Sequence, residues 1–266
     1  MPQRTKYDPG TPSYVDLASP DLEGSKQFYG ALFGWDFVDQ DTGDPNNPYV
    51  TITQGGKTVA GLRFLSPEMR MGGMPTVWST YVTVESIDDS VKKAMNLDGA
   101  LLAPAMDVMD AGRMGVISDP LGAVFCIWEP RNSIGSELVN EPVSLTWNEL
   151  VTPDPKKVAA FYGGLFGWKA EMNPMPDIGR DYTVWVPEGG EHGVAGAMKP
   201  PMEGMPTFWG VYFSVADTDA TVAKAEQLGA TVLAGPMDIP DVGRFATLTD
   251  PQGATFSVLK NAHPTQ

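Results

Sequence analysis

Cysteine, histidine and basic residues are all scarce in this chain of 266 residues. The single cysteine, Cys126, excludes an internal disulfide, so we expect a reducing, cytoplasmic compartment. The only two histidines, His192 and His263, leave the first half of the chain with none. The 18 Lys and Arg residues against 33 Asp and Glu give a net charge of −15, which argues against nucleic acid and anionic membranes as partners.

Long hydrophobic runs are also missing. No apolar segment approaches the roughly 20 residues of a membrane span, and the polar first 13 residues do not resemble a signal peptide. The sequence has no phosphate-binding glycine motif, because the pairs Gly55-Gly56 and Gly189-Gly190 have the pattern of hairpin turns. The sequence therefore predicts a soluble protein without a membrane or nucleotide partner.

The chain contains two copies of one long pattern. The segment Phe28–Trp35 (FYGALFGW) returns 133 residues later as FYGGLFGW, and Asp119–Ala123 (DPLGA) returns 131 residues later as DPQGA. A repeat of this length indicates a duplicated domain. We predict one domain at residues 11–130, a linker at 131–142 and a second domain at 143–262.

Within each half, the predicted elements repeat once more. The first half has the pattern of a strand at 14–18, a helix at 22–33, strands at 49–53 and 59–64, a methionine-rich loop at 67–75, a strand at 77–84, a helix at 86–97 and strands at 101–103, 113–118 and 124–128. The second half follows with a strand at 145–151, a helix at 155–166, strands at 182–187, 194–198 and 207–215, a helix at 217–228 and further strands. Each half therefore consists of two β-α-β-β-β modules in an α+β fold.

Four such modules with these two motifs resemble the vicinal oxygen chelate superfamily, which includes glyoxalase I, extradiol dioxygenases and bleomycin-resistance proteins. The chain is more narrowly similar to two-domain glyoxalase-like proteins of actinomycetes, some of which accompany aromatic polyketide pathways. The resemblance covers nearly the whole chain. It implies two tandem domains, each a curved mixed sheet of two modules around a ligand-binding cavity, but the fold hosts several chemistries and does not settle the function.

The resemblance also implies where metal ligands would lie, because metal-dependent members place His and Glu on the inward faces of four strands. Here these positions hold Tyr14, Ser79, Cys126 and, nearby, Gly61 in the first half, and Trp147, Gly210, Ser257 and Gly196 in the second. Apart from a soft ion at Cys126, these residues do not suit a metal. His192 lies in a predicted turn and His263 in the tail, so we expect no catalytic metal and no cofactor.

Strand alternation predicts which other side chains line each cavity. The expected ligand-binding residues are Tyr14, Ser79, Tyr81, Cys126, Trp128, Trp147, Tyr212 and Ser257, with Met74 and Met205 from the matching loops. Methionine side chains adapt to flat apolar ligands. Loop anchoring or a domain interface would also account for these methionines.

The same alternation makes Asp16 and Glu149 the candidates for chemistry. An inward carboxyl group among aromatic walls can act as a general acid or base, or can bind a ligand hydroxyl. Alternatively, each pairs with a backbone N–H, a tyrosine hydroxyl, Arg113 or Arg244 and only holds strands together. The two arginines could themselves clamp an acidic ligand or pair with neighbouring aspartates.

Four functions are compatible with the sequence. We favour a metal-free protein that binds a hydrophobic or aromatic small molecule, as a carrier, a resistance protein or a biosynthetic accessory protein with an enzyme partner. The second is a metal-free acid/base enzyme of secondary metabolism, an isomerase, cyclase or lyase that uses Asp16 or Glu149. The ligand positions argue against a metal-dependent glyoxalase or dioxygenase, and no feature specifically supports an interaction protein. The ligand, the half that carries the site and the oligomeric state stay open.

Overall fold

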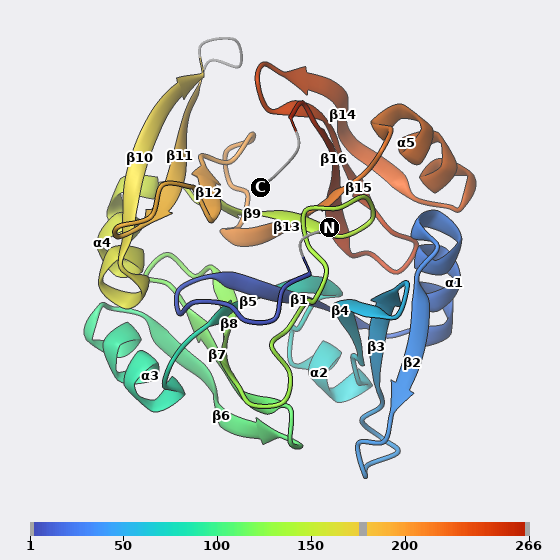
Figure 1. The fold of residues 1–266 in the computed structure, drawn as a ribbon, viewed down its shortest axis with the longest axis horizontal. Coiled ribbons are helices and arrows are strands. Elements are labelled where there is room, and N and C mark those ends of the chain that lie inside the picture. Colours follow the sequence, from blue (N-terminus) through green and yellow to red (C-terminus); the bar gives the residue numbers. More distant parts are fainter. Residues whose placement is uncertain (1–2, 176–179, 264–266) are drawn as a thin grey trace.

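Each half of the chain forms one eight-stranded mixed sheet in the computed structural model (Figure 1), which describes residues 3–175 and 180–263. The elements of the first half are β1 (Pro12–Ser19), α1 (Leu22–Phe33), β2 (Asp36–Gln40), β3 (Tyr49–Gln54), β4 (Lys57–Phe64), α2 (Pro67–Met71), β5 (Val77–Thr83), α3 (Ile87–Asn96), β6 (Ala100–Val108), β7 (Gly112–Ser118) and β8 (Val124–Pro130). Those of the second half are β9 (Leu145–Val151), α4 (Pro155–Phe166), β10 (Trp168–Met175), β11 (Arg180–Pro187), β12 (Ala195–Met198), β13 (Phe208–Ser214), α5 (Thr218–Gln227), β14 (Thr231–Ile239), β15 (Gly243–Thr249) and β16 (Thr255–Asn261).

An antiparallel pair of strands joins the two modules at the centre of each sheet. β1 pairs with β5 in the first half, and β9 pairs with β13 in the second. β4 and β8 add in parallel on either side of the first pair, as β12 and β16 do in the second half. The predicted α+β fold with two β-α-β-β-β modules per half is therefore confirmed.

The helices of the repeated motif begin and end where the sequence predicts. The side chain of Asp21 accepts a hydrogen bond from the amide of Gly24 at the start of α1, and Gly34 ends the helix with a φ of 73°, which glycine adopts readily. The sequence did not predict β2 and β10, because most of their side chains are exposed and show no clear alternation. The predicted methionine-rich loop contains the short helix α2, which begins after the capping side chain of Ser66.

The hydrophobic cores are shared between the two halves. Val15 and Leu17 of β1 face α1, and they belong to the same buried cluster as Phe28. This cluster also includes Phe213 of β13 and Phe256 of β16, from the other half. A second cluster joins the remaining two modules in the same way, and α1 lies beside α5 while α3 lies beside α4 (Figure 1). The faces that carry the helices are therefore packed against each other, and the side chains that the sequence predicts for the site lie on the opposite faces.

The repeated motifs form hydrogen bonds across this junction. The hydroxyl of Tyr29 donates to Asp250 at 2.8 Å and accepts from the indole N–H of Trp78 at 2.9 Å. Tyr162 forms the equivalent pair of bonds, with Asp119 at 3.0 Å and Trp209 at 3.1 Å. The tyrosine of each Phe-Tyr-Gly motif thus binds the aspartate of the Asp-Pro-x-Gly turn in the other half, and the duplication of both motifs has a structural explanation.

The segment 131–142 that connects the halves is itself hydrogen-bonded to the first half. The amide of Ser136 donates to the carbonyl of Ser13, and the carboxylate of Glu137 accepts from the amide of Thr58. The indole of Trp128 donates to the carbonyl of Ser133 at 2.9 Å. In the part of the chain that the structure describes, no helix is long and apolar enough to cross a membrane.

Candidate functional site

The inner face of the first sheet holds Asp16 at its centre. This carboxyl group on β1 is 1% exposed, and Tyr81 of β5 donates its hydroxyl to Oδ2 at 2.8 Å. Nε of Arg63 on β4 lies 3.5 Å from Oδ1, an ion-pair distance, and Oδ1 has no hydrogen bond to any described residue. Met74 lies beside the arginine, with its sulfur 4.0 Å from Nη2. The structure therefore brings Asp16, Tyr81 and Met74 together as the sequence predicts, and adds Arg63.

Two tyrosine hydroxyls fill the space beside Gly61. Tyr14 of β1 and Tyr49 of β3 hydrogen-bond to each other at 2.9 Å, and a Cβ atom at Gly61 would collide with the Tyr49 hydroxyl. These hydroxyls occupy the space that a side chain at this position would need. Burial raises the pKa of both tyrosines, so their hydroxyls stay protonated at neutral pH.

The other predicted residues of this face are placed around the same centre. Ser79 lies opposite Asp16 in the register of β1 and β5 and is half-buried, whereas Cys126 lies opposite Tyr81 and is buried. Burial, together with the charge of Asp16, raises the pKa of the Cys126 thiol to about 12. Trp128 packs with Tyr81 and Cys126 in a small cluster, and its N–H is bound to Ser133 as described above. Cys126 is accordingly a neutral thiol in this environment.

The inner face of the second sheet repeats this arrangement around Glu149. Tyr212 donates its hydroxyl to Oε1 at 2.8 Å, and Trp147 donates its indole N–H to the hydroxyl of Tyr182 at 2.8 Å. A Cβ atom at Gly196 would collide with that hydroxyl, as at Gly61. Ser257 is buried and hydrogen-bonded to Thr247, and Met205 is half-buried in the loop before β13.

The two carboxyl groups differ in charge environment. β4 carries Arg63 two residues after Gly61, whereas β12 carries Met198 two residues after Gly196. Burial raises the pKa of Glu149, although hydrogen bonds from Tyr212 and Tyr182 oppose this shift. Glu149 can therefore hold a proton closer to neutral pH than an exposed glutamate does. Asp16 differs from it in having the guanidinium of Arg63 at ion-pair distance.

Arg113 and Arg244 do not contact these carboxyl groups in the structure. Arg113 pairs with Asp88 at 3.3 Å, and Arg244 pairs with Asp219 at 2.7 Å and with Asp238 at 3.0 Å. The prediction that they pair with nearby aspartates is correct, whereas the suggestion that they bind Asp16 or Glu149 is wrong. The arginine beside Asp16 was missed because it lies on β4, at a position that the motif spacing does not mark.

The donor groups of the inner faces do not fit a metal ion. Each face offers one carboxyl group beside tyrosine hydroxyls, and the first face adds the buried thiol of Cys126. Among the residues that the structure describes, no three His, Cys, Asp or Glu side chains are grouped closely enough to hold a metal. His192 is exposed, and His263 lies beyond β16.

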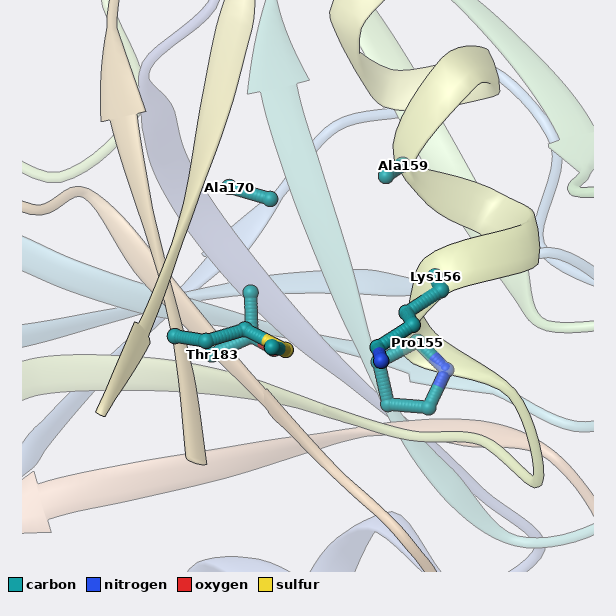
Figure 2. Close-up of a pocket in the computed structure, with 6 residues that line it drawn as sticks. Pro155, Lys156, Ala159, Ala170 and Thr183 are labelled. Atoms are coloured by element: carbon teal, nitrogen blue, oxygen red, sulfur yellow. The ribbon is translucent and has the colours of Figure 1, made fainter. Parts of the chain in front are cut away.

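A surface groove lies away from both inner faces, between α4 and the β10–β11 hairpin. One part of it, of about 250 Å³, is lined by Pro155, Lys156, Ala159, Ala170, Met172 and Thr183 (Figure 2). An adjoining part of about 590 Å³ extends past Asp181 and Lys199. Motif spacing and strand alternation did not predict this groove, although the two repeats differ in sequence at residues that line it.

Comparison with known proteins gives consistent results. The profile of the "Glyoxalase/Bleomycin resistance protein/Dioxygenase superfamily" matches residues 11–127, and that of the "Glyoxalase-like domain" matches residues 146–259. The chain is 44% identical to "Putative glyoxylase CFP32" of Mycobacterium tuberculosis (98% of this chain, 99% of the relative). It is 36% identical to "Anthracycline biosynthesis protein DnrV" of Streptomyces peucetius (96% and 95%).

Solved structures with the same fold are more distant in sequence. The 2,3-dioxygenase LapB from Pseudomonas sp. KL28 has a TM-score of 0.64 at 13% identity, over 96% of this chain and 93% of that one. The Mn(II)-bound glyoxalase from Novosphingobium aromaticivorans has a TM-score of 0.60 at 15% identity, over 96% and 85%. At these identities the similarity shows the fold alone.

Proposed function

Since the chain belongs to the glyoxalase/bleomycin resistance protein/dioxygenase superfamily, we propose that it binds a hydroxylated aromatic small molecule at the inner faces of its sheets, without a metal ion. The observation that carries this proposal is the pairing, in each half, of one buried carboxyl group with a tyrosine hydroxyl on an aromatic wall. The role would be that of a carrier, a resistance protein or a biosynthetic accessory protein in the cytoplasm, and an accessory role would add a biosynthetic enzyme as partner.

The aromatic walls support a flat ligand. Tyr14 and Tyr81 form an edge-to-face pair with ring centroids 5.7 Å apart, and Tyr212 lies 6.4 Å from Phe245 in the other half. Tyr14, Trp147 and Tyr212 are only half-buried, so a ligand ring can reach them. Stacking against such rings contributes about 0.5–1.5 kcal/mol beyond the burial of apolar area.

The carboxyl groups support a ligand that carries hydroxyls. Oδ1 of Asp16 is buried beside Arg63 at 3.5 Å and accepts no hydrogen bond from the described residues, so a ligand O–H that reaches it would supply one. The similarity to a protein named for anthracycline biosynthesis agrees with this chemistry, because anthracyclines contain hydroxylated fused rings. The lack of a suitable donor set among the residues that the structure describes supports the metal-free part of the proposal.

A calorimetric titration with 1,8-dihydroxyanthraquinone tests this function. We expect saturable binding that weakens about two- to tenfold in Asp16→Asn or Glu149→Gln, according to the half that holds the ligand, because one hydrogen bond to the ligand is changed. Lys169→Gln, an exposed change on β10, serves as the control and leaves the affinity unchanged. No saturable binding, or equal affinity in all variants, would overturn the proposal.

Acid/base catalysis at Glu149 is the second candidate function, and the raised pKa of this carboxyl group favours it. With Oε1 held by Tyr212, Glu149 could accept a proton from a bound substrate and return it to another atom, as an isomerase or cyclase requires. Glu149→Gln keeps the shape but cannot transfer the proton. Full turnover of a confirmed substrate by this variant would exclude the enzymatic function and leave the binding function intact.

A further inference from the structure

The groove between α4 and the β10–β11 hairpin exists in the second half because three side chains of the first repeat are absent there. Lys26 of α1 forms an ion pair with Asp39 of β2 at 2.8 Å, and the ring of Phe37 packs on α1 beside Gly30. The residues 133 positions later are Ala159, Met172 and Ala170. The second repeat therefore lacks this ion pair and this aromatic ring between α4 and β10.

The contacts of the two equivalent glycines show the same difference. A Cβ atom at Gly30 would lie 3.2 Å from the ring of Phe37. At Gly163 it would meet the carbonyl oxygen of Trp168 and no ring of a described residue. The pocket of about 250 Å³ in Figure 2 occupies this region, with Ala159 on the helix side and Ala170 and Thr183 on the strand side.

The charge at the mouth of the groove is also reversed between the repeats. The first turn of α1 carries Glu23, whereas α4 has Lys156 at that position, followed by Lys157, and no acidic residue in its first turn. Positive side chains at a helix N-terminus add to the partial positive charge of the helix dipole. Asp154 caps the helix by accepting from the amide of Lys157 at 3.0 Å. Lys156 is the one charged residue that lines the 250 Å³ part among those described, whereas Asp154, Asp181 and Lys199 line the adjoining part.

We propose that this groove is a second small-molecule site, specific to the second half, which binds an aromatic carboxylate. The ring lies between Ala159 and Ala170 against the thioether of Met172, which is 50% exposed and free to adapt. The carboxylate lies at the first turn of α4 and pairs with Lys156. The proposal does not depend on ligand binding at the inner faces.

The test uses the full chain with methionine labelled by carbon-13 in its methyl group and 2-naphthoate as the probe. We expect a saturable shift of the Met172 methyl signal, which Met172→Leu identifies by its disappearance. Ala170→Phe restores the aromatic ring of the first repeat, so it weakens binding more than tenfold. Lys156→Glu introduces the acidic side chain that the first repeat has at the equivalent position, Glu23. We expect it to weaken binding about threefold or more. The neutral analogue 2-naphthamide binds at least threefold more weakly than the carboxylate.

Two matched controls accompany these variants. Lys169→Gln removes a charge from β10, the strand that carries Ala170 and Met172. Lys169 is exposed, pairs with Glu188 and does not line the groove, so we expect the affinity to be unchanged. Glu149→Gln also binds 2-naphthoate as before, which separates this site from the inner face. An unchanged Met172 signal, equal affinity in Ala170→Phe, or equal affinity for the amide and the carboxylate would each overturn the proposal.

Discussion

At the scale of single residues, Glu149 is a buried acid without the cation that accompanies Asp16. Its pKa is raised by burial above the ordinary value of 4.5. The folded state therefore binds the proton more tightly than the unfolded state, and the stability that this proton contributes is lost as pH rises through the raised pKa. In this window a single group changes the free energy of unfolding by up to about 1.4 kcal/mol per pH unit.

We predict that Glu149→Gln removes this contribution. Above pH 4.5 the variant should lose less stability with rising pH than the wild-type chain does, because its side chain has no proton to release. Urea unfolding at several pH values between 4.5 and 8 measures the difference. Asp119 and Asp250, which also have raised pKa values, are unchanged in both proteins and cancel in the comparison. Parallel stability curves would show that Glu149 is ionised in the folded state at all these pH values.

Gly61 offers a second prediction at this scale. Its φ lies outside the left-handed region, so alanine is excluded by the Tyr14 and Tyr49 hydroxyls and not by the backbone. We expect Gly61→Ala to lower the free energy of unfolding by about 1–3 kcal/mol, the usual cost of overpacking. Adding Tyr49→Phe removes the colliding hydroxyl and should recover part of that loss. An alanine variant as stable as the wild type would mean that the tyrosines leave room beside this glycine.

Strand alternation and motif spacing were enough to predict the positions of Asp16, Glu149 and Tyr81 on the inner faces. They did not predict Tyr49 or Arg63, which lie on β3 and β4. The register of β4 against β1, and of β3 against β4, depends on backbone pairing between segments that are far apart in the sequence. A local sequence pattern does not predict such a register.

At the scale of elements, the repeated helix and turn motifs are explained by the hydrogen bonds that they form between the halves. Replacing Tyr29 with Phe leaves the buried Asp250 and the indole N–H of Trp78 without this partner. We expect a loss of about 1–2 kcal/mol in the free energy of unfolding, and a similar loss for Tyr162→Phe.

Chemical denaturation of both variants measures this effect. Tyr7→Phe makes the same chemical change at a hydroxyl that binds the carbonyl of Ser136 in the connecting segment and not an aspartate of the other half, and it serves as the reference. Stabilities of Tyr29→Phe and Tyr162→Phe equal to the wild type would contradict a stabilising role for the cross-half bonds.

The helices were predictable because their caps and apolar spacing are local signals, as Asp21 and Gly34 show. β2 and β10 were not predictable, because an edge strand with mostly exposed side chains has little alternation to detect.

At the scale of the whole molecule, the two halves share their hydrophobic cores. Phe28 of the first half contacts Phe256 of the second, with ring centroids 6.2 Å apart. The sequence pattern of each half predicts which faces of its helices and strands are apolar. It does not predict that these apolar faces also pack against the other half.

We therefore predict that the halves do not fold independently. A fragment of residues 1–142 should show no cooperative urea transition of its own, because its helix-bearing face would expose apolar side chains such as Phe28 and Trp78. The full chain should unfold in a single calorimetric transition. A fragment with its own sharp transition would contradict this prediction.

Native mass spectrometry of the protein purified gently from its own host, with parallel metal analysis, shows whether the inner faces bind an aromatic molecule without a metal ion. We expect a retained organic molecule and no stoichiometric metal. A stoichiometric divalent metal, with no organic molecule bound, would contradict this expectation and favour a glyoxalase or dioxygenase activity.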